Sequence, residues 1–264
     1  MVPVIALFSP GYPHAEFYTI VAIFMRLGYF ATLDASGDFD FAIAWQDRTW
    51  LYDQPLLEQI ARRKPVLNLR CKDISKRLVE SVFQTVFGYS TFIDPTAYDR
   101  PCVKKYDENA RGGAIVQCPI PHLDAQFVYQ RFIDSSRDGC MIEYRVPVIC
   151  DELPVIYIQE KTVPRDTIKT RKVALEVASA SDVFSPDEVA GIREFCRRIG
   201  LDFGELDILR ANDDGRIYIL DANKTPGGFG ILNKMKWRPD QRRIAIERLS
   251  AAFEAGIRAR LAAQ

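Results

Sequence analysis

The segment from 205 to 223 constrains the fold of this chain most, because it predicts a β-hairpin whose two arms place an acid opposite an acid. Two runs rich in branched aliphatic residues flank the turn sequence Asn-Asp-Asp-Gly at 212–215. Pairing outward from this turn sets Asp207 directly opposite Asp221, and Asn223 points to the same face. The apolar residues expected on that face are Leu209, Ile217 and Ile219.

Two facing carboxylates repel each other by about 0.2–1 kcal/mol across a hairpin, and burial raises this cost. A magnesium ion relieves the repulsion, because it takes oxygen ligands and shares them with nucleotide phosphates. The hairpin therefore favours a divalent cation such as magnesium between Asp207 and Asp221. On this reasoning, neutralising Asp221 stabilises the metal-free protein. A Lys or Arg paired with one acid, or a shifted turn, is the alternative explanation without a metal.

The loop that follows the hairpin strengthens the magnesium hypothesis. It reads Asn-Lys-Thr-Pro-Gly-Gly at 223–228 and leaves the end of the second arm. Lys224 is then positioned to meet a phosphate group beside the metal, and we assign it a catalytic role on that ground. The alternative for Lys224 is a solvated loop charge.

The composition is typical of a globular protein and narrows its partners. The 264 residues include 35 Lys and Arg and 35 Asp and Glu, so the formal net charge is zero. General binding to nucleic acid or to a membrane surface needs a basic excess, and no stretch approaches the roughly 18 apolar residues of a membrane span. The six cysteines contain no CxxC pair, which predicts free thiols and a cytoplasmic location. Only two histidines are present, which disfavours zinc and hydrolase chemistry.

The predicted elements change character along the chain. Strand-helix-strand alternation over residues 1–70 indicates a small parallel α/β sheet. A helix follows over 72–86, with Asp73 as its cap. Beyond Gly88 an antiparallel or mixed α+β region is expected, with short strands at 101–106, 113–118, 126–133, 141–149 and 154–160.

The last third of the chain is predicted to contain two helices. The basic segment 161–172 lacks apolar periodicity and is expected to be a loop. Ser185 opens a capping box with proline at the first helical position, so a helix should run from there to Ile199. An amphipathic helix over 239–262 ends the pattern.

Acid, hairpin turn, strand and then Asp-Ala-Asn-Lys-Thr-Pro-Gly resembles the C-terminal signature of the ATP-grasp enzymes. The resemblance implies an ATP-grasp fold in which Asp207, Asp221 and Asn223 bind Mg²⁺. This chain has Asp221 where the family usually has Glu, and Glu205 where D-alanine ligase-like members have an arginine. The residues that stand in for this missing cation are expected to be Lys224, Arg145 or the basic loop 161–172.

Two lysines that contact ATP phosphates in the family have counterparts here. The first stands on a helix, and the resemblance assigns this role to Lys76, with Lys72 as the alternative. The second stands on a strand in a Val-Val-Lys-Pro context. Cys-Val-Lys-Lys at 102–105 is similar to it, so the role falls to Lys104, with Lys105 as the alternative.

The remaining ATP contacts follow in the order that the family uses. Gly112 and Gly113 resemble the flexible lid loop, where glycine lets backbone N–H groups approach phosphate, although a plain hairpin turn also explains them. Asp134 or Asp138 would take the ribose. The hinge whose backbone would line adenine consists of Gln130, Arg131, Phe132 and Ile133.

Two further basic residues complete the resemblance. Arg145 resembles the strand arginine of RimK-like ligases and is expected to act in catalysis, with a cross-strand acid partner as the alternative. Lys161 stands where the family often has another phosphate-contacting basic residue.

The resemblance implies three parts: an α/β domain over 1–70, a lid over 71–128, and a metal-bearing core over 129–264. It implies a ligase that uses Mg-ATP to activate a small carboxylate as an acyl phosphate for attack by an amine or thiol. A small-molecule kinase and a non-catalytic ATP-binding protein are the alternatives, and a homodimer is compatible with either. The acceptor is expected near the end of the first strand, at Ser9, Tyr12 and His14.

Overall fold

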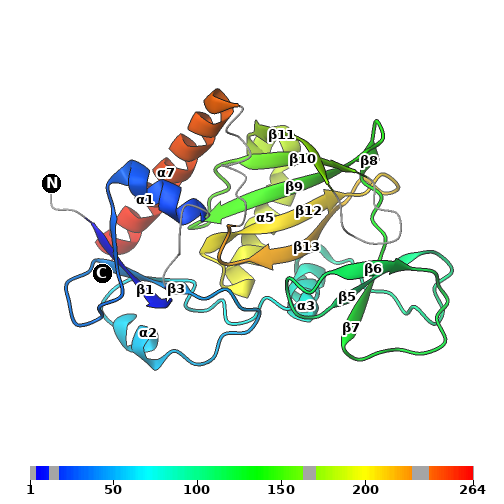
Figure 1. Ribbon diagram of the computed structural model, residues 1–264, viewed down its shortest axis with the longest axis horizontal. Helices are drawn as coiled ribbons and strands as arrows, with labels where there is room; N and C mark the ends of the chain where they lie inside the picture. The colour runs from blue at the N-terminus through cyan, green and yellow to red at the C-terminus, as the bar shows by residue number, and fades with distance from the viewer. Residues whose placement is uncertain (1–3, 12–17, 163–170, 228–237, 264) are drawn as a thin grey trace.

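The computed structural model describes residues 4–11, 18–162, 171–227 and 238–263. Three β-sheets make up its framework (Figure 1). A four-stranded sheet and a three-stranded sheet lie on either side of a larger sheet of six strands. In the part of the chain that is described, no helix has the length and apolar character needed to cross a membrane.

The first sheet confirms the predicted parallel α/β arrangement. Its strand order is β2-β1-β3-β4, and each neighbouring pair is parallel. β3 is the inner strand whose five residues are all buried, as expected for a strand covered on both faces. The elements are β1 (Ile5–Pro10), α1 (Thr19–Leu27), β2 (Phe30–Thr32), β3 (Phe41–Trp45), α2 (Pro55–Ile60) and β4 (Val66–Leu67).

Helix α3 (Lys76–Phe87) leads from this sheet into the three-stranded sheet. Its N-cap is Ser75, whose side chain accepts a hydrogen bond from Leu78 N, so the prediction of Asp73 as the cap is wrong. Asp73 instead accepts a hydrogen bond from Ser75 N, one step before the helix. The antiparallel sheet that follows has the order β6-β5-β7. Its strands are β5 (Cys102–Tyr106), β6 (Gly113–Val116) and β7 (Phe127–Arg131).

The large sheet has the order β11-β10-β9-β12-β13, with β8 paired to β9. The prediction that 161–172 is a loop is wrong at both ends, because β10 continues to Thr162 and β11 begins at Lys172; the segment between lies outside the described residues. The strands are β8 (Ser136–Arg137), β9 (Cys140–Ile149), β10 (Ile156–Thr162), β11 (Lys172–Ala178), β12 (Phe203–Arg210) and β13 (Ile217–Asn223). The helices near this sheet are α4 (Ala180–Val183), α5 (Pro186–Ile199) and α7 (Pro239–Ala262).

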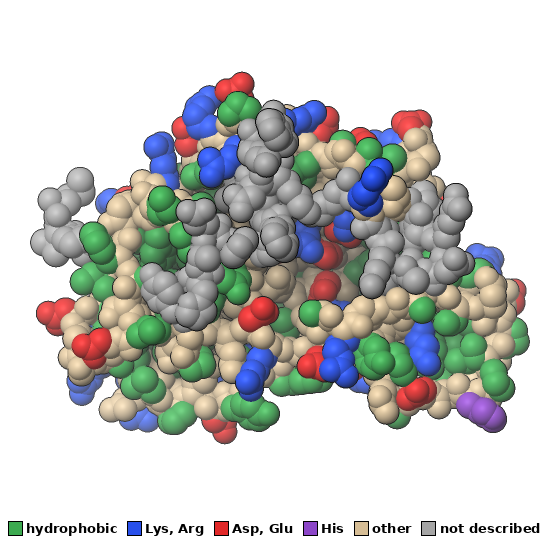
Figure 2. Space-filling view, in the orientation of Figure 1, with side chains coloured by type: hydrophobic (Ala, Val, Ile, Leu, Met, Phe, Trp, Pro, Cys, Tyr) green, Lys and Arg blue, Asp and Glu red, His purple; other side chains and the backbone are tan. Residues whose placement is uncertain are grey.

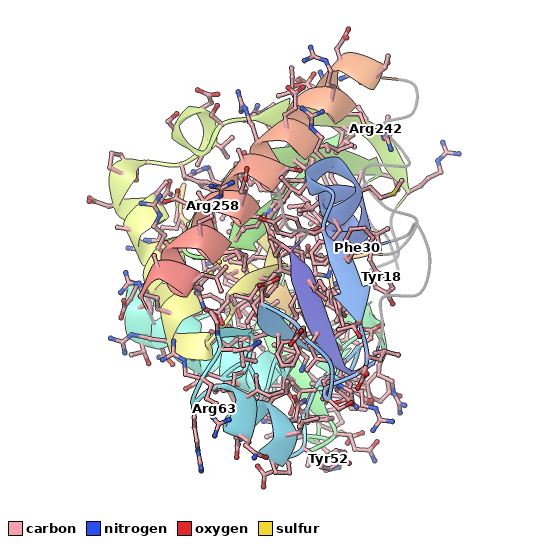
Figure 3. The ribbon with its side chains drawn as sticks, turned by 90° about the vertical axis from the view of Figure 1, so that its left-hand side faces the viewer. Tyr18, Phe30, Tyr52, Arg63, Arg242 and Arg258 are labelled. Carbon is pink, nitrogen blue, oxygen red and sulfur yellow. The ribbon has the colours of Figure 1, made fainter. Side chains whose placement is uncertain are left out.

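The two faces of the large sheet have different neighbours. One face packs on α3 and α5, through a buried cluster that includes Val146, Leu206, Phe83 and Phe195. The other face packs at one end against the first sheet and α7, in a cluster that includes Phe203 and Phe253. Figure 3 shows α7, with Arg242 and Arg258 along it, lying beside α1. The remaining part of this second face carries charged residues, among them Glu143, Asp207 and Asp221, and these residues line a cavity.

The hairpin pairs Asp207 with Asp221, as the turn sequence predicted. Beyond this pair the register shifts, so Ile208 faces Ile219 and Leu209 faces Tyr218. The prediction that Ile217 and Ile219 share a face with the acids is therefore wrong, whereas Leu209, on the strand without the extra residue, lines one cavity together with both acids. A β-bulge causes the difference, because the extra residue on β13 reverses the alternation beyond it.

The boundaries proposed at residues 70 and 128 stay predictions. β7 (Phe127–Arg131) runs through the second of them, and it pairs with β5 over its full length.

Candidate functional site

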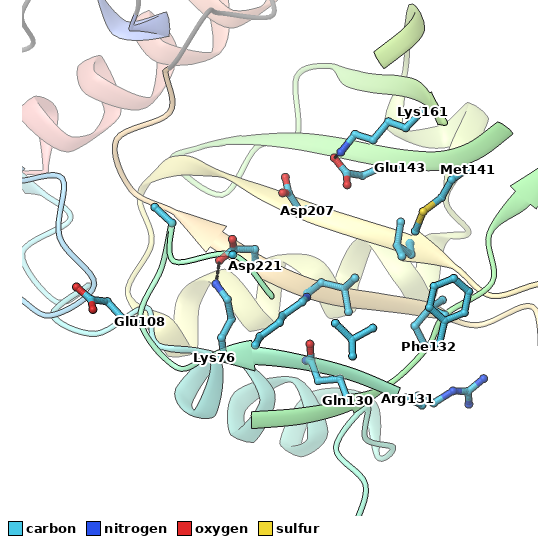
Figure 4. Close-up of a pocket in the computed structure, with 17 residues that line it drawn as sticks. Lys76, Glu108, Gln130, Arg131, Phe132, Met141, Glu143, Lys161, Asp207 and Asp221 are labelled. Atoms are coloured by element: carbon cyan, nitrogen blue, oxygen red, sulfur yellow. Dashed lines mark hydrogen bonds and ion pairs between the residues drawn. The ribbon is translucent and has the colours of Figure 1, made fainter. Parts of the chain in front are cut away.

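A first cavity of about 280 Å³ lies between the three-stranded sheet and the open face of the large sheet (Figure 4). It brings together nine residues that the sequence predicted to be functional: Lys76, Gly112, Gln130, Arg131, Phe132, Ile133, Lys161, Asp207 and Asp221. The other lining residues are Val103, Lys105, Glu108, Ala110, Met141, Glu143, Leu209 and Leu220. Figure 2 shows acidic and basic side chains meeting near the centre of this side of the molecule.

One end of the first cavity is apolar. Val103 and Ile133 come from the three-stranded sheet and its hinge, and Met141, Leu209 and Leu220 come from the large sheet. Phe132 and Ile133 follow the last residue of β7 and belong to no strand, and among the described residues no backbone hydrogen bond of either is recorded. An apolar wall next to peptide groups that can hydrogen-bond suits a flat ring with polar edges.

The two adjacent lysines of β5 point to opposite faces of their sheet. Lys104 lies outside the cavity, with Nζ 3.8 Å from the centre of the Phe127 ring and 4.0 Å from Asp124 Oδ2. Lys105 lines the cavity, where burial and the nearby Lys76 ammonium lower its pKa. Strand alternation allows only one of the two lysines to face the cavity, and the structure places the alternative, Lys105, there in place of Lys104.

Lys76 opens α3 and reaches the acidic hairpin. Its side chain is buried, and Nζ donates a hydrogen bond of 2.7 Å to Asp221 Oδ1, drawn in Figure 4. The second recorded acceptor of Lys76 is the Asn109 side chain in the loop between β5 and β6. Lys72, the alternative, pairs with Asp53 and Glu58 away from the cavity. The assignment to Lys76 thus agrees with its position.

Arg145 stands in register with both acids of the hairpin. β9 pairs it with Asp207, and β12 pairs Asp207 with Asp221, so the three form one row across the sheet. Arg145 Nε lies 2.7 Å from Asp207 Oδ1, and Nη1 donates to Glu205 Oε1 at 2.8 Å. Burial by itself lowers the pKa of Arg145, but the carboxylates of Asp207, Glu205 and Glu143 outweigh it and raise the value. A guanidinium on the neighbouring strand thus lies beside both Glu205 and Asp207.

Glu143 was not identified from the sequence. It lines the first cavity and forms an ion pair with Lys161 on the adjacent strand β10. Burial and the Asp207 carboxylate raise the pKa of Glu143, while Lys161 offsets part of the rise. The sequence could have indicated Glu143 by its position on β9, two residues from Arg145, because alternate residues of a strand share a face.

A second cavity of about 610 Å³ adjoins the first and shares Asp207, Asp221, Glu108 and Ala110 with it. The loop after β3 contributes much of its wall, from Asp47 to Tyr52. Two aromatic residues of this loop are exposed, Trp50 by 46% and Tyr52 by 75%. Arg145, Glu205 and Asn223 line its floor.

Several predicted residues lie elsewhere. Ser9 is within β1 and lines neither cavity, whereas Tyr12 and His14 are outside the described residues. Gly113 pairs with Lys105 in the strand ladder, so Gly112, with a φ of 75°, is the glycine at the cavity. The two candidates for ribose binding, Asp134 and Asp138, line neither cavity.

Lys224 is the clearest exception to the sequence predictions. Its side chain is fully buried, lines neither cavity, and its Nζ has no hydrogen-bond partner among the described residues. Burial lowers its pKa, and the nearby Cys71, Asp73 and Asp47 work in the opposite direction. The structure therefore places Lys224 away from both cavities, so the expected phosphate contact at Lys224 is corrected: its side chain is buried and does not reach either of them.

The residues of the hairpin suit a hard cation by their chemistry. Asp207, Asp221 and Asn223 all line the second cavity and offer oxygen donors, which magnesium prefers. Asn223 Oδ1 already accepts a hydrogen bond of 2.9 Å from Thr225 N, which fixes the orientation of its amide. Each carboxylate has about four acceptor positions, so the ion pairs to Arg145 and Lys76 leave capacity for a metal. Within the described ranges, no group of three or more His, Cys, Asp or Glu side chains is placed to hold a metal ion.

The three sheets, the hinge and the acidic hairpin are arranged in the ATP-grasp fold. Solved structures of ATP-grasp ligases have the same fold over most of the chain. D-alanine–D-alanine ligase from Bacillus anthracis matches with a TM-score of 0.58 at 14% identity, over 99% of this chain and 100% of that one. The ATP-grasp ligase PsnB, complexed with a phosphomimetic variant of minimal precursor, Mg and ADP, matches with a TM-score of 0.58 at 13% identity, over 97% and 98% of the two chains. No family model and no curated protein matches the sequence.

Proposed function

We propose that this protein is an ADP-forming ATP-grasp ligase that activates a carboxylate as an acyl phosphate and joins it to an amine. The observation that supports this most is the position of Asp207 and Asp221, which line both cavities at their junction. A phosphoryl group passed from a nucleotide in the first cavity to an acceptor in the second would cross at these acids. Structures with the same fold hold ATP, or Mg and ADP.

The first cavity suits ATP with its adenine at the apolar end. The peptide groups of Phe132 and Ile133 would bind the ring edge, and Val103 and Leu220 would cover its faces. The triphosphate would then extend toward Lys105, Lys161 and Lys76, whose ammonium groups neutralise its charge. In the loop over 107–112, Gly112 lets the backbone approach the phosphates closely.

Magnesium, when bound by Asp207, Asp221 and Asn223, would neutralise phosphate charge and align the γ-phosphate. Arg145 holds the Asp207 carboxylate in place from β9, and Lys76 holds Asp221 from α3. These contacts fix both ligands before a metal arrives, which lowers the entropy cost of assembling the site.

The second cavity would hold the substrate carboxylate beside the γ-phosphate. One carboxylate oxygen attacks the γ-phosphorus, the bond from phosphorus to the ADP oxygen breaks, and ADP leaves. The amine nitrogen then attacks the acyl carbon, phosphate departs with the carbon–oxygen bonding pair, and the nitrogen loses a proton. Arg145 lines this cavity and can stabilise the charge on the transferring group. D-alanine ligase-like enzymes have an arginine for this role two residues before the first acid of the hairpin. A ligase of this kind consumes cytoplasmic ATP, so a cytoplasmic location belongs to the proposal, while a homodimer stays a prediction.

ADP release tests the proposal. The protein is incubated with Mg-ATP and pooled small carboxylic acids, with and without pooled amines. Release that requires both pools, with an acid-only intermediate trapped by hydroxylamine, supports the ligase. A phosphorylated product stable to hydroxylamine would instead identify a kinase, and nucleotide binding without turnover in any pool would identify a non-catalytic protein. Asp207→Asn should abolish release, whereas Asp240→Asn, at the first turn of α7, is the control and should not.

A further inference from the structure

Two cysteines of the three-stranded sheet are in direct contact. Cys102 begins β5, and Cys118 follows the end of β6, with their Sγ atoms 3.1 Å apart. A disulfide has a sulfur–sulfur distance of about 2.05 Å, so a movement of roughly 1 Å brings the two sulfur atoms to bonding distance. The contact joins two residues that stand 16 positions apart, and the segment between them contains the loop over the first cavity.

The two thiols differ in their access to solvent. Cys102 is fully buried, whereas Cys118 is half-buried. Burial and the hydrogen bond with Cys118 raise the pKa of Cys102 to about 12. A half-buried thiol with a buried second thiol in contact is the usual arrangement of a redox-responsive pair, because the exposed sulfur reacts and the buried one resolves.

We propose that Cys102 and Cys118 form a thiol pair that a low-molecular-weight disulfide, such as glutathione disulfide, oxidises to an intramolecular disulfide. This bond fastens β5 to the chain after β6, at the end of the β5–β6 ladder opposite the loop over 107–112. The inference is independent of the reaction proposed above, since it rests on the contact of the two sulfur atoms alone.

The reaction balances in two exchange steps. The Cys118 thiolate attacks one sulfur of glutathione disulfide, which forms a mixed disulfide and releases one glutathione thiolate. Cys102 then loses its proton to solvent and attacks Sγ of Cys118, which forms the protein disulfide and releases the second glutathione thiolate. The protein loses two electrons and two protons, and glutathione disulfide is reduced to two glutathione molecules.

The pair lies at one end of the β5–β6 ladder and does not line the first cavity. Cys102 and Lys104 share the face of β5 that points away from the first cavity, while Val103 and Lys105 line it. The oxidised protein therefore keeps the lining of the first cavity, but the strands that frame it are joined covalently.

The test uses the full-length protein, reduced, freed of reductant and incubated with glutathione disulfide at pH 8. Thiol titration under denaturing conditions should fall from six free thiols to four. Peptide mapping without reduction should find the peptides that contain Cys102 and Cys118 linked. The melting temperature should rise by roughly 5 °C and return to its starting value after dithiothreitol, because the bond closes a loop of this size.

Single substitutions separate the pair from the other thiols. Cys118→Ser and Cys102→Ser should each prevent the linked peptide, whereas Cys140→Ser, a half-buried cysteine of the large sheet, should leave it unchanged. Six thiols that still titrate, a stable glutathione adduct on Cys118, or a link to another cysteine would each overturn the proposal. If Cys102→Ser does not fold, the peptide map of the unsubstituted protein decides the question by itself.

Discussion

Lys76 Nζ donates a hydrogen bond to Asp221 Oδ1 at 2.7 Å, joining two residues that stand 145 positions apart in the sequence. Asp207, the acid opposite Asp221, has its own cation in Arg145. The two facing carboxylates are therefore each paired with a basic side chain from another element. This arrangement offsets the repulsion that the hairpin alone predicts, and it changes what the loss of either acid should do.

Asp221→Asn should lower the stability of the metal-free protein, by about 1 kcal/mol, since the buried Lys76 ammonium loses its carboxylate partner. The repulsion argument from the sequence gives the opposite sign, and the ion pair reverses it. ADP release should be lost as well, because the neutral amide is a poorer magnesium ligand. Thermal melting without metal and turnover with Mg-ATP measure the two effects. A more stable variant would mean that repulsion between the acids outweighs the ion pair.

ATP should bind much more weakly without a divalent cation, because Asp207 and Asp221 present negative charge to the phosphates. Calorimetry with magnesium and with a chelator measures the difference. AMP is the matched control, since it lacks the β- and γ-phosphates and should bind with similar affinity under both conditions. Equal ATP affinity with and without metal would contradict a magnesium site at the hairpin.

Lys105→Ala should weaken Mg-ATP binding by about 10–100-fold, because it removes a charged donor from the first cavity. Lys104→Ala, its neighbour on the opposite face, should change the affinity by less than about threefold. The two variants have the same change in charge, so their difference reports on position alone. A larger effect of Lys104→Ala would restore the sequence-based assignment.

The affinity for ATP should fall as the pH rises through the pKa of Lys105. Burial and Lys76 lower this pKa from its ordinary value, so the free protein loses the ammonium proton at a lower pH than an exposed lysine does. Phosphate stabilises the ammonium form of Lys105, so the pKa of Lys105 is higher in the ATP complex than in the free protein. Between these two pKa values, ATP binding should take up a proton. Calorimetry in buffers of different ionisation enthalpy measures this uptake. Lys105→Arg stays charged and should remove it, and uptake that persists in this variant would point to another group.

Arg145→Lys should reduce turnover by about 10²–10³-fold while ATP still binds. A lysine keeps the charge but cannot contact Glu205 and Asp207 together, as the guanidinium does. Steady-state ADP release and nucleotide calorimetry separate the two steps. Arg193→Lys, on the surface of α5, is the control, because its pair with Glu152 is exposed and should contribute little. Normal turnover in Arg145→Lys would leave this arginine a structural role only.

The sequence by itself determined the local parts of this protein. The turn at 212–215 set Asp207 opposite Asp221, and the capping box at Ser185 started α5 where expected, since both depend on residues close in the chain. The parallel sheet over the first 70 residues followed from alternating strands and helices in the same way.

Tertiary structure decided which side chains reach the site. Alternation on β5 leaves only one of two adjacent lysines facing the cavity, and the sequence does not state which face the cavity lies on. The bulge in the hairpin, the pairing of Lys76 with Asp221, and the burial of Lys224 all depend on distant elements packed together. The physical reason is that local patterns specify a residue's direction relative to its own strand or helix, whereas its partners depend on where every other element lies.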